Sequence, residues 1–144
     1  MTITQISRRT VVKVAAAAPL LISAKALGRQ PGSGANERVN VGIIGLGGRC
    51  RTIAQDCLNI PEMRVVAVCD CFQPRIDEMM KSVGRDRNWK TYTDFRQMID
   101  NENLDGVMVE TTTHARAWVT CHAMAAGIDV YIEKPMALTI AEGR

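Results

Sequence analysis

The chain has 144 residues, of which 47% are hydrophobic and 23% charged, and its formal net charge is +3. This composition is that of one ordinary globular domain, and so small a positive charge gives no reason to expect a nucleic-acid partner. The five cysteines form no CxxC pair, so we expect neither a metal site nor a disulfide framework.

Residues 1–30, at the start of the chain, are predicted to be a twin-arginine signal peptide and linker that lie outside the fold. Arg8 and Arg9 precede a short alanine-rich apolar run, and Ala24–Ala26 offers a small-x-small cleavage site. This pattern predicts recognition by the twin-arginine export machinery and a periplasmic location. The run is far shorter than the roughly 20 residues that cross a bilayer, so no stable membrane span is expected. An amphipathic N-terminal helix is the alternative interpretation.

A glycine-rich turn follows the first apolar run of the folded part, Val39–Ile44. The turn reads Gly45-Leu46-Gly47-Gly48-Arg49 and opens a helix, a pattern typical of βαβ units that bind dinucleotides. Gly45 permits a sharp turn, and Gly47 lacks the side chain that would keep a pyrophosphate away from the backbone. The following helix directs unpaired N–H groups and its positive dipole end at the phosphates. Cys50 stands where a third Gly or Ala is usual.

A second predicted strand, Met63–Cys69, ends in Asp70, at the distance along the chain where such units place an acid. The Asp70 carboxylate is predicted to accept hydrogen bonds from both hydroxyls of the adenosine ribose. Its negative charge repels the 2′-phosphate of NADP, and the neighbouring Cys71 is uncharged, so the sequence favours NAD over NADP. Arg75, one helical turn further on, is the feature that opposes this choice.

The remaining residues alternate between apolar runs and helical patterns. This alternation predicts an α/β fold of the Rossmann type, a doubly wound parallel sheet with helices on both faces. The predicted elements are a helix closed by Pro61, a helix from Pro74 to Val83, a strand 90–92, a helix 94–99 capped by Thr93, a strand 104–109, a helix 115–126 and a strand 129–132.

Two loops of this predicted sheet carry polar residues toward one crevice. Strand order reverses between the first and fourth strands of a doubly wound sheet, so the loops after the fourth and fifth strands face the ligand. Thr111, His114, Glu133 and Lys134 are therefore predicted to approach the nicotinamide half of a dinucleotide. Thr111 is alternatively a helix N-cap, and His114 a surface or capping histidine. Glu110 has no assigned role, although burial of an unpaired carboxylate at a strand end is costly.

Lys134 is the predicted catalytic residue. Pro135 holds it at the crevice, where a lysine can bind a substrate hydroxyl and help to move its proton as hydride leaves the carbon. The alternative is an ordinary solvated lysine at a strand end.

Together these segments resemble the Gfo/Idh/MocA family, named for glucose-fructose oxidoreductase and inositol dehydrogenase. The resemblance rests on the glycine turn, on Asp70, on residues 92–95 and above all on the run from Asp129 to Pro135. It implies that residues 38–144 form a NAD(P)-binding Rossmann domain, with further substrate and catalytic groups on a C-terminal α/β domain. In the family the lysine of the Glu-Lys-Pro motif contacts the nicotinamide ribose and the substrate; here this lysine is Lys134.

The chain departs from the family pattern after its fourth strand. Thr111 is kept, but Glu110 replaces the usual Ala, Thr112 replaces the usual Pro, and Arg116 stands at a position that is often His. Further on, Thr139 and Glu142 have the spacing of a capping box that begins a new helix. Because the sequence ends soon afterwards, we expect the chain to be truncated before its substrate domain.

The sequence therefore predicts the nucleotide-binding domain of an exported oxidoreductase acting on CH–OH groups of a sugar, cyclitol or polyol. One alternative is a redox-neutral glycosidase or epimerase of the same family, which oxidises and re-reduces its substrate with tightly held NAD. Another is a cofactor-binding fragment that catalyses nothing alone. A homo-oligomer is compatible with each interpretation.

Overall fold

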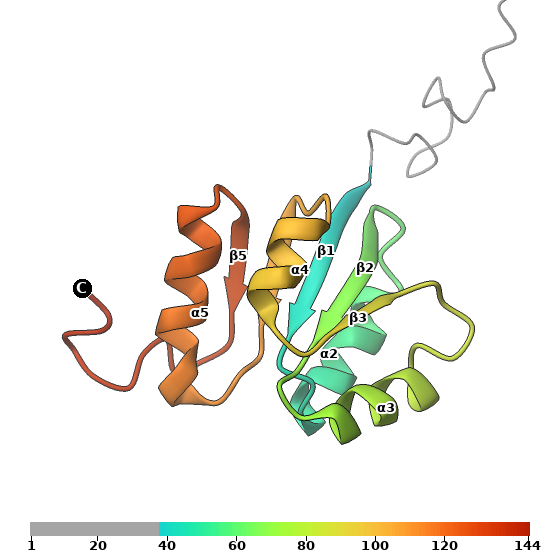
Figure 1. Ribbon diagram of the computed structural model, residues 1–144, viewed down its shortest axis with the longest axis horizontal. Coiled ribbons are helices and arrows are strands. Elements are labelled where there is room, and N and C mark those ends of the chain that lie inside the picture. Colours follow the sequence, from blue (N-terminus) through green and yellow to red (C-terminus); the bar gives the residue numbers. More distant parts are fainter. Residues whose placement is uncertain (1–37) are drawn as a thin grey trace, which may run out of the picture.

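The computed structural model describes residues 38–144, so the predicted twin-arginine segment lies outside the described residues. Strands and helices alternate along this part of the chain (Figure 1). The elements are β1 (Val39–Ile44), α2 (Gly48–Cys57), β2 (Met63–Cys69), α3 (Gln73–Ser82), β3 (Lys90–Tyr92), α4 (Phe95–Asn101), β4 (Gly106–Val109), α5 (Thr113–Ala125) and β5 (Asp129–Ile132).

All strand pairs of the sheet are parallel, and the strand order is β3-β2-β1-β4-β5. The order therefore reverses between β1 and β4, which confirms the predicted doubly wound Rossmann-type fold. Because every pairing is parallel, as the arrowheads of β1, β2 and β5 in Figure 1 also show, the carboxyl ends of the strands share one edge of the sheet. This edge is where a ligand of such a sheet binds.

Two apolar cores form, one on each face of the sheet. Successive side chains of a strand point to opposite faces, and the neighbours Ile43 and Ile44 accordingly belong to different cores. Helices α2 and α3 cover the first core, while α4 and α5 cover the second. Burial on both faces explains why residues 65–69 of β2 form a continuous apolar run.

Several predicted boundaries need correction. Helix α2 ends at Cys57, before Pro61, because the chain already turns there with hydrogen bonds such as Ile60 N–H to the Cys57 carbonyl, 3.1 Å. Strand β4 is Gly106–Val109 rather than 104–109, and α5 begins at Thr113, two residues earlier than predicted.

The N-cap of α4 is Asp94 and not the predicted Thr93. Asp94 has extended backbone angles, and its carboxylate Oδ1 accepts the Arg96 N–H at 3.0 Å. The side-chain hydrogen bond from Arg96 is the main cause that lowers the pKa of Asp94 to about 2. An ionised acceptor at the helix start therefore performs the capping that the sequence assigned to a hydroxyl.

The predicted capping box near the end of the chain is present. Glu142 N–H donates to Thr139 Oγ1 at 3.2 Å, and Glu142 Oε2 accepts the N–H groups of Thr139 and Leu138 at 3.1 and 2.8 Å. These bonds stabilise a turn over residues 140–143, and the predicted helix does not follow within the described chain.

The cysteines of the described chain are all free thiols. Cys50, Cys57 and Cys69 are buried, whereas Cys71 and Cys121 are exposed. Burial is the main cause that raises the pKa of Cys50 and of Cys69 to about 12. Over residues 38–144, none of the helices is both long and apolar enough to cross a bilayer.

Candidate cofactor site

The glycine turn after β1 has the two properties that the sequence predicts. Gly45 has φ +92°, and a Cβ there would lie 2.7 Å from Thr111 N and 2.8 Å from the Glu110 carbonyl carbon. Gly45 is therefore required by backbone angle and by the close approach of the β4 loop. At Gly47 a Cβ would meet nothing within 4 Å, so this glycine leaves open space beside the backbone.

The N-terminus of α2 opens on the same space. Gly47 is its N-cap and makes no side-chain capping bond, so the first N–H groups of the helix are available to a phosphate. Cys50, only 1% exposed, packs beneath this first turn. A thiol is therefore small enough to fill the position where a third Gly or Ala is usual.

Asp70 lies at the carboxyl end of β2 and is 5% exposed. Its Oδ2 accepts the Leu46 N–H at 2.8 Å, and its Oδ1 accepts the Phe72 N–H at 2.9 Å. Arg75 Nη1 lies 3.7 Å from Oδ2. Sequence reasoning assigned Asp70 to the adenosine ribose but missed that it also fixes the glycine turn against β2. Each carboxylate oxygen retains a further lone pair for a ribose hydroxyl.

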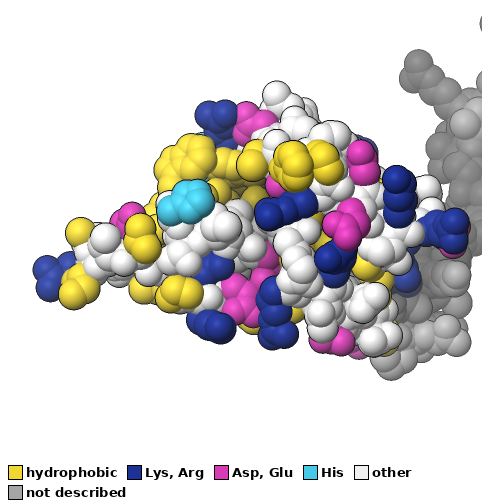
Figure 2. Space-filling model, turned by 90° about the horizontal axis from the view of Figure 1, so that it is seen from below, with side chains coloured by type: hydrophobic (Ala, Val, Ile, Leu, Met, Phe, Trp, Pro, Cys, Tyr) yellow, Lys and Arg dark blue, Asp and Glu magenta, His cyan; other side chains and the backbone are white. Residues whose placement is uncertain are grey.

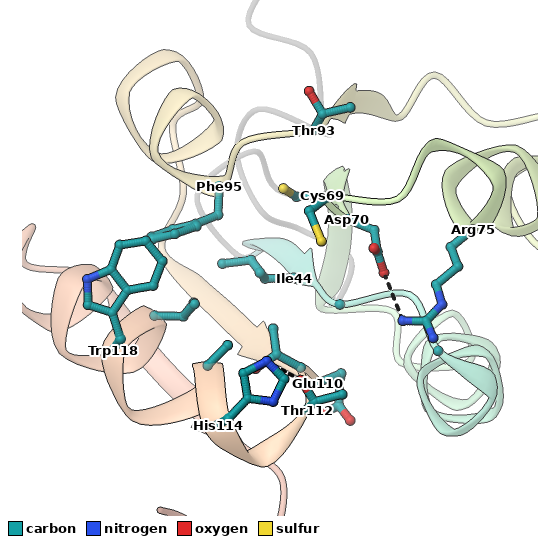
Figure 3. Close-up of a pocket in the computed structure, with 16 residues that line it drawn as sticks. Ile44, Cys69, Asp70, Arg75, Thr93, Phe95, Glu110, Thr112, His114 and Trp118 are labelled. Carbon is teal, nitrogen blue, oxygen red and sulfur yellow. Dashed lines mark hydrogen bonds and ion pairs between the residues drawn. The ribbon is translucent and has the colours of Figure 1, made fainter. Parts of the chain in front are cut away.

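A cavity of about 330 Å³ lies at this edge of the sheet. Figure 2, which looks onto the edge, shows a hydrophobic recess beside a histidine. In Figure 3, Asp70 and Arg75 line one side, and His114 and Trp118 line the other. The volume falls in the usual range for small-molecule sites.

Phe95 and Trp118 form an apolar wall of this cavity that sequence reasoning did not identify. Their ring centroids are 5.0 Å apart in an edge-to-face arrangement, and Trp118 is 57% exposed. Such a wall suits a flat, weakly polar ring of a ligand. The only signal in the sequence was two aromatic residues in separate helices, with nothing to indicate that they meet.

The structure brings some predicted site residues to the cavity and leaves others beside it. Gly45, Gly47, Asp70, Thr111 and His114 line it. The remaining candidates are not among the residues that line it. They lie on the glycine turn and on the loop after β5, and these are Leu46, Gly48, Arg49, Glu133 and Lys134.

Glu133 connects the glycine turn to the loop after β5. Its Oε1 lies 3.4 Å from Arg49 Nε, and its Oε2 accepts the Lys134 backbone N–H at 3.0 Å. This backbone hydrogen bond is the main cause that lowers the pKa of Glu133. Lys134 itself is exposed, and its peptide bond to Pro135 is cis.

Arg116, like Glu110, is a residue that sequence reasoning left without a role. It is 6% exposed, and its guanidinium donates to the Pro135 carbonyl at 2.7 Å and also to the Thr111 carbonyl. It thereby ties the loop after β4 to the loop after β5. A planar fork of donors suits two carbonyls in this way, which His at the same position does not match.

The structure excludes the helix-cap interpretation of Thr111 and shows that His114 is exposed. The N-cap of α5 is Thr112, so Thr111 is not the cap, and its buried Oγ1 has no hydrogen-bond partner among the described residues. His114 is exposed in the first turn of α5, with Nε2 3.4 Å from Thr112 Oγ1.

Glu110, directly after β4, is half-buried. Its pKa is raised, chiefly by burial and then by the nearby Glu133, while Arg116 and Arg49 oppose the rise. An acid whose pKa is higher in the folded than in the unfolded state destabilises the fold once ionised. Stability is therefore lost as the pH rises from the unfolded pKa through the folded one.

Glu110→Gln is accordingly expected to raise the midpoint of thermal unfolding at neutral pH. The gain should disappear below pH 4.5, the ordinary pKa of a glutamate, where the wild-type carboxyl is also neutral. Thermal unfolding followed by circular dichroism across this pH range measures the effect. An equal gain at acid and neutral pH would contradict a charge-based cause.

Comparison with known proteins gives one family and several relatives. The profile of the Gfo/Idh/MocA oxidoreductase family, described as having an NAD-binding Rossmann fold, matches residues 39–144. A myo-inositol 2-dehydrogenase of Thermotoga maritima is 33% identical over 107 residues, 72% of this chain and 30% of that protein. An alpha-N-acetylgalactosaminidase of Shewanella oneidensis is 26% identical over 112 residues, 74% of this chain and 24% of that protein.

Solved structures agree with the fold. The crystal structure of a myo-inositol 2-dehydrogenase from Lactobacillus plantarum superposes with a TM-score of 0.66 at 30% identity, covering 73% of this chain and 30% of that one. The chain thus spans less than a third of the length of the relatives it matches.

Proposed function

The chain belongs to the Gfo/Idh/MocA family of oxidoreductases with an NAD-binding Rossmann fold, and we propose that it is the NAD-binding domain of an exported enzyme. This enzyme acts on CH–OH groups of a sugar, cyclitol or polyol. The observation that carries this proposal is the glycine turn, where Gly45 is sterically required and Gly47 opens space at a helix N-terminus. The myo-inositol 2-dehydrogenase relatives support the substrate class.

The chain's own residues divide into two groups along the carboxyl edge of the sheet. The turn from Gly45 to Arg49 and the N-terminus of α2 hold the pyrophosphate, and Asp70 holds the adenosine ribose. Thr111, His114 and the β5 loop serve the nicotinamide half. These assignments follow the order of the strands, because Asp70 ends β2 on one side of the β1–β4 reversal and the loops of β4 and β5 lie on the other.

Lys134 is the proposed catalytic residue. Bound NAD supplies the acceptor for a hydride. The Lys134 amine binds the substrate hydroxyl and takes its proton while the carbon gives up the hydride, which leaves a carbonyl product. The exposure of Lys134 and the hold of Arg116 on the next residue support a fixed, accessible position for this amine.

The chain alone is expected to bind NAD without turnover, because the family resemblance places further substrate and catalytic groups on another domain. A screen of cyclitols and sugars with NAD therefore tests the activity of the full-length protein, with the absorbance of NADH as the signal. Reduction of NAD that is lost in Lys134→Ala, with NAD affinity retained, supports the assignment. Steady turnover that survives Lys134→Ala places the proton transfer elsewhere.

Cofactor choice gives a separate prediction. NAD is expected to bind more tightly than NADP, because the Asp70 carboxylate repels a 2′-phosphate. The Arg75 guanidinium, whose charge would attract that phosphate, is already paired with Asp70 at 3.7 Å. Titrations of the purified chain with each cofactor, followed by calorimetry, measure the difference. Tighter binding of NADP would mean that Arg75 turns toward the phosphate and decides the choice.

The redox-neutral alternative has its own support, namely the similarity to an alpha-N-acetylgalactosaminidase and to glycosyl hydrolase family 109 proteins. An enzyme that oxidises and re-reduces one substrate keeps its NAD. Cofactor that survives purification and does not exchange with added labelled NAD favours this alternative. Ready exchange favours the dehydrogenase.

Export by the twin-arginine route is supported by Arg8 and Arg9 ahead of a weakly apolar run. Replacing both arginines with lysine is expected to keep the precursor in the cytoplasm. Fractionation of cells that express each form measures the outcome. Unchanged export of the lysine variant would show that this segment is a different kind of leader.

A further inference from the structure

Buried polar atoms without partners gather at the carboxyl end of β4. Glu110 Oε1, Thr111 Oγ1 and Arg116 Nε are each buried and make no hydrogen bond among the described residues. The one further atom of this kind within residues 38–144 is Thr120 Oγ1. Folded proteins rarely leave such atoms unpaired, since each has lost its water without gaining a partner. A local cluster of them is therefore informative.

The atoms of this cluster can together donate and accept hydrogen bonds. A carboxylate oxygen accepts hydrogen bonds, a hydroxyl both donates and accepts, and a guanidinium N–H donates. Glu110 and Thr111 are neighbours on the loop whose backbone lies against Gly45, and both line the cavity. In Figure 3 Glu110 lies on the side of the cavity that also holds Thr112 and His114.

The charges around Glu110 leave its carboxylate without an ion pair. Arg49 lies against Glu133, and Arg116 directs its terminal nitrogens to two backbone carbonyls. Within the described residues, therefore, neither arginine forms an ion pair with Glu110. Its acceptor capacity is left for a molecule that enters the cavity.

We propose that Glu110 is a specificity residue for the nicotinamide riboside half of NAD, whose ribose hydroxyls donate to its unpartnered carboxylate oxygen. Asp70 and Glu110 then form a pair of acids, one at the end of β2 and one at the end of β4, on opposite sides of the β1–β4 reversal. Each binds one of the two riboses. This inference rests on NAD binding as part of the proposed function.

Three ligands of increasing length test the inference. ADP ends at the pyrophosphate, ADP-ribose adds the second ribose, and NAD adds the nicotinamide. Glu110→Gln is expected to weaken ADP-ribose and NAD by about tenfold, the effect of one hydrogen bond to a charged group, and to leave ADP unchanged. Calorimetric titration of the wild-type and variant chains gives the three dissociation constants.

Glu62→Gln is the matched control, because Glu62 is exposed and immediately precedes β2, at the opposite edge of the sheet. It makes the same change of charge and should alter none of the three constants. Thermal unfolding of Glu110→Gln, with a midpoint no lower than that of the wild type, confirms that the variant is folded.

Three results would overturn the inference. Equal weakening of all three ligands would mean that Glu110 acts on the glycine turn, and no weakening of ADP-ribose would mean that it does not touch the ribose. A wild-type chain that binds none of the three would overturn NAD binding itself, and this inference with it. The pattern across the ligands therefore distinguishes the two failures.

Discussion

Gly45→Ala is expected to lower the free energy of unfolding by roughly 2–5 kcal/mol. A left-handed backbone costs a residue with a Cβ about 1–2 kcal/mol, and overpacking adds about 1–3 kcal/mol. Here φ is +92°, and the new Cβ would lie within 2.9 Å of three backbone atoms of Glu110 and Thr111. Backbone cannot move aside as a flexible side chain does, so either β1 or the β4 loop must shift. Denaturant unfolding measures the loss.

Gly47→Ala is the matched control, since it makes the same chemical change two residues away. Gly47 has φ −69°, which alanine adopts readily, and its Cβ would meet nothing. The variant should keep its stability but lose at least about tenfold in NAD affinity, because the new methyl group occupies the approach to the backbone. Equal stability of the two alanine variants would contradict the role assigned to Gly45. Unchanged NAD affinity of Gly47→Ala would contradict the position assigned to the pyrophosphate.

Arg116→Met is expected to cost about 2–4 kcal/mol of stability, because it removes two hydrogen bonds from a charged donor in a part-buried setting. Methionine keeps much of the side-chain volume, so the loss reports mainly on the guanidinium. The carbonyls of Thr111 and Pro135 then lose the group that joins their loops. Amide hydrogen exchange should rise in residues 133–137 while the amides of β1 stay protected.

Arg51→Met provides the comparison. Arg51 lies on α2 and pairs with Glu78 on the surface, where an ion pair contributes about 0–1 kcal/mol. Its loss should leave exchange in residues 133–137 unchanged. If Arg116→Met is no more destabilising than Arg51→Met, Arg116 does not hold the two loops together.

The fold could be predicted from the sequence because its signals are local. Apolar runs alternate with helical patterns, and a glycine turn separates the first strand from its helix, so the parallel order of the sheet follows from general rules. Boundaries failed where particular side-chain contacts decide them. Asp94 replaces Thr93 as a cap because its carboxylate also binds the Arg96 side chain.

The site was predictable in part for the same reason. The tasks of Gly45 and Gly47 follow from backbone geometry, and the structure has the open space and the close approach they require. The tasks of Arg116 and of the Phe95–Trp118 wall depend on which loops and helices meet. No spacing along the chain predicts these contacts, so the roles of these residues became visible only in the folded structure.

The reactivity of the five thiols reports whether the chain is folded, because three are buried and two are exposed. A thiol reagent that reaches the folded molecule marks Cys71 and Cys121, whereas Cys50, Cys57 and Cys69 become available only when the cores open. Burial also keeps the latter three protonated and slow to react with oxidants. In an oxidising compartment each opening exposes three thiols that can couple wrongly. Coupling that involves these three thiols is therefore limited by how often the cores open.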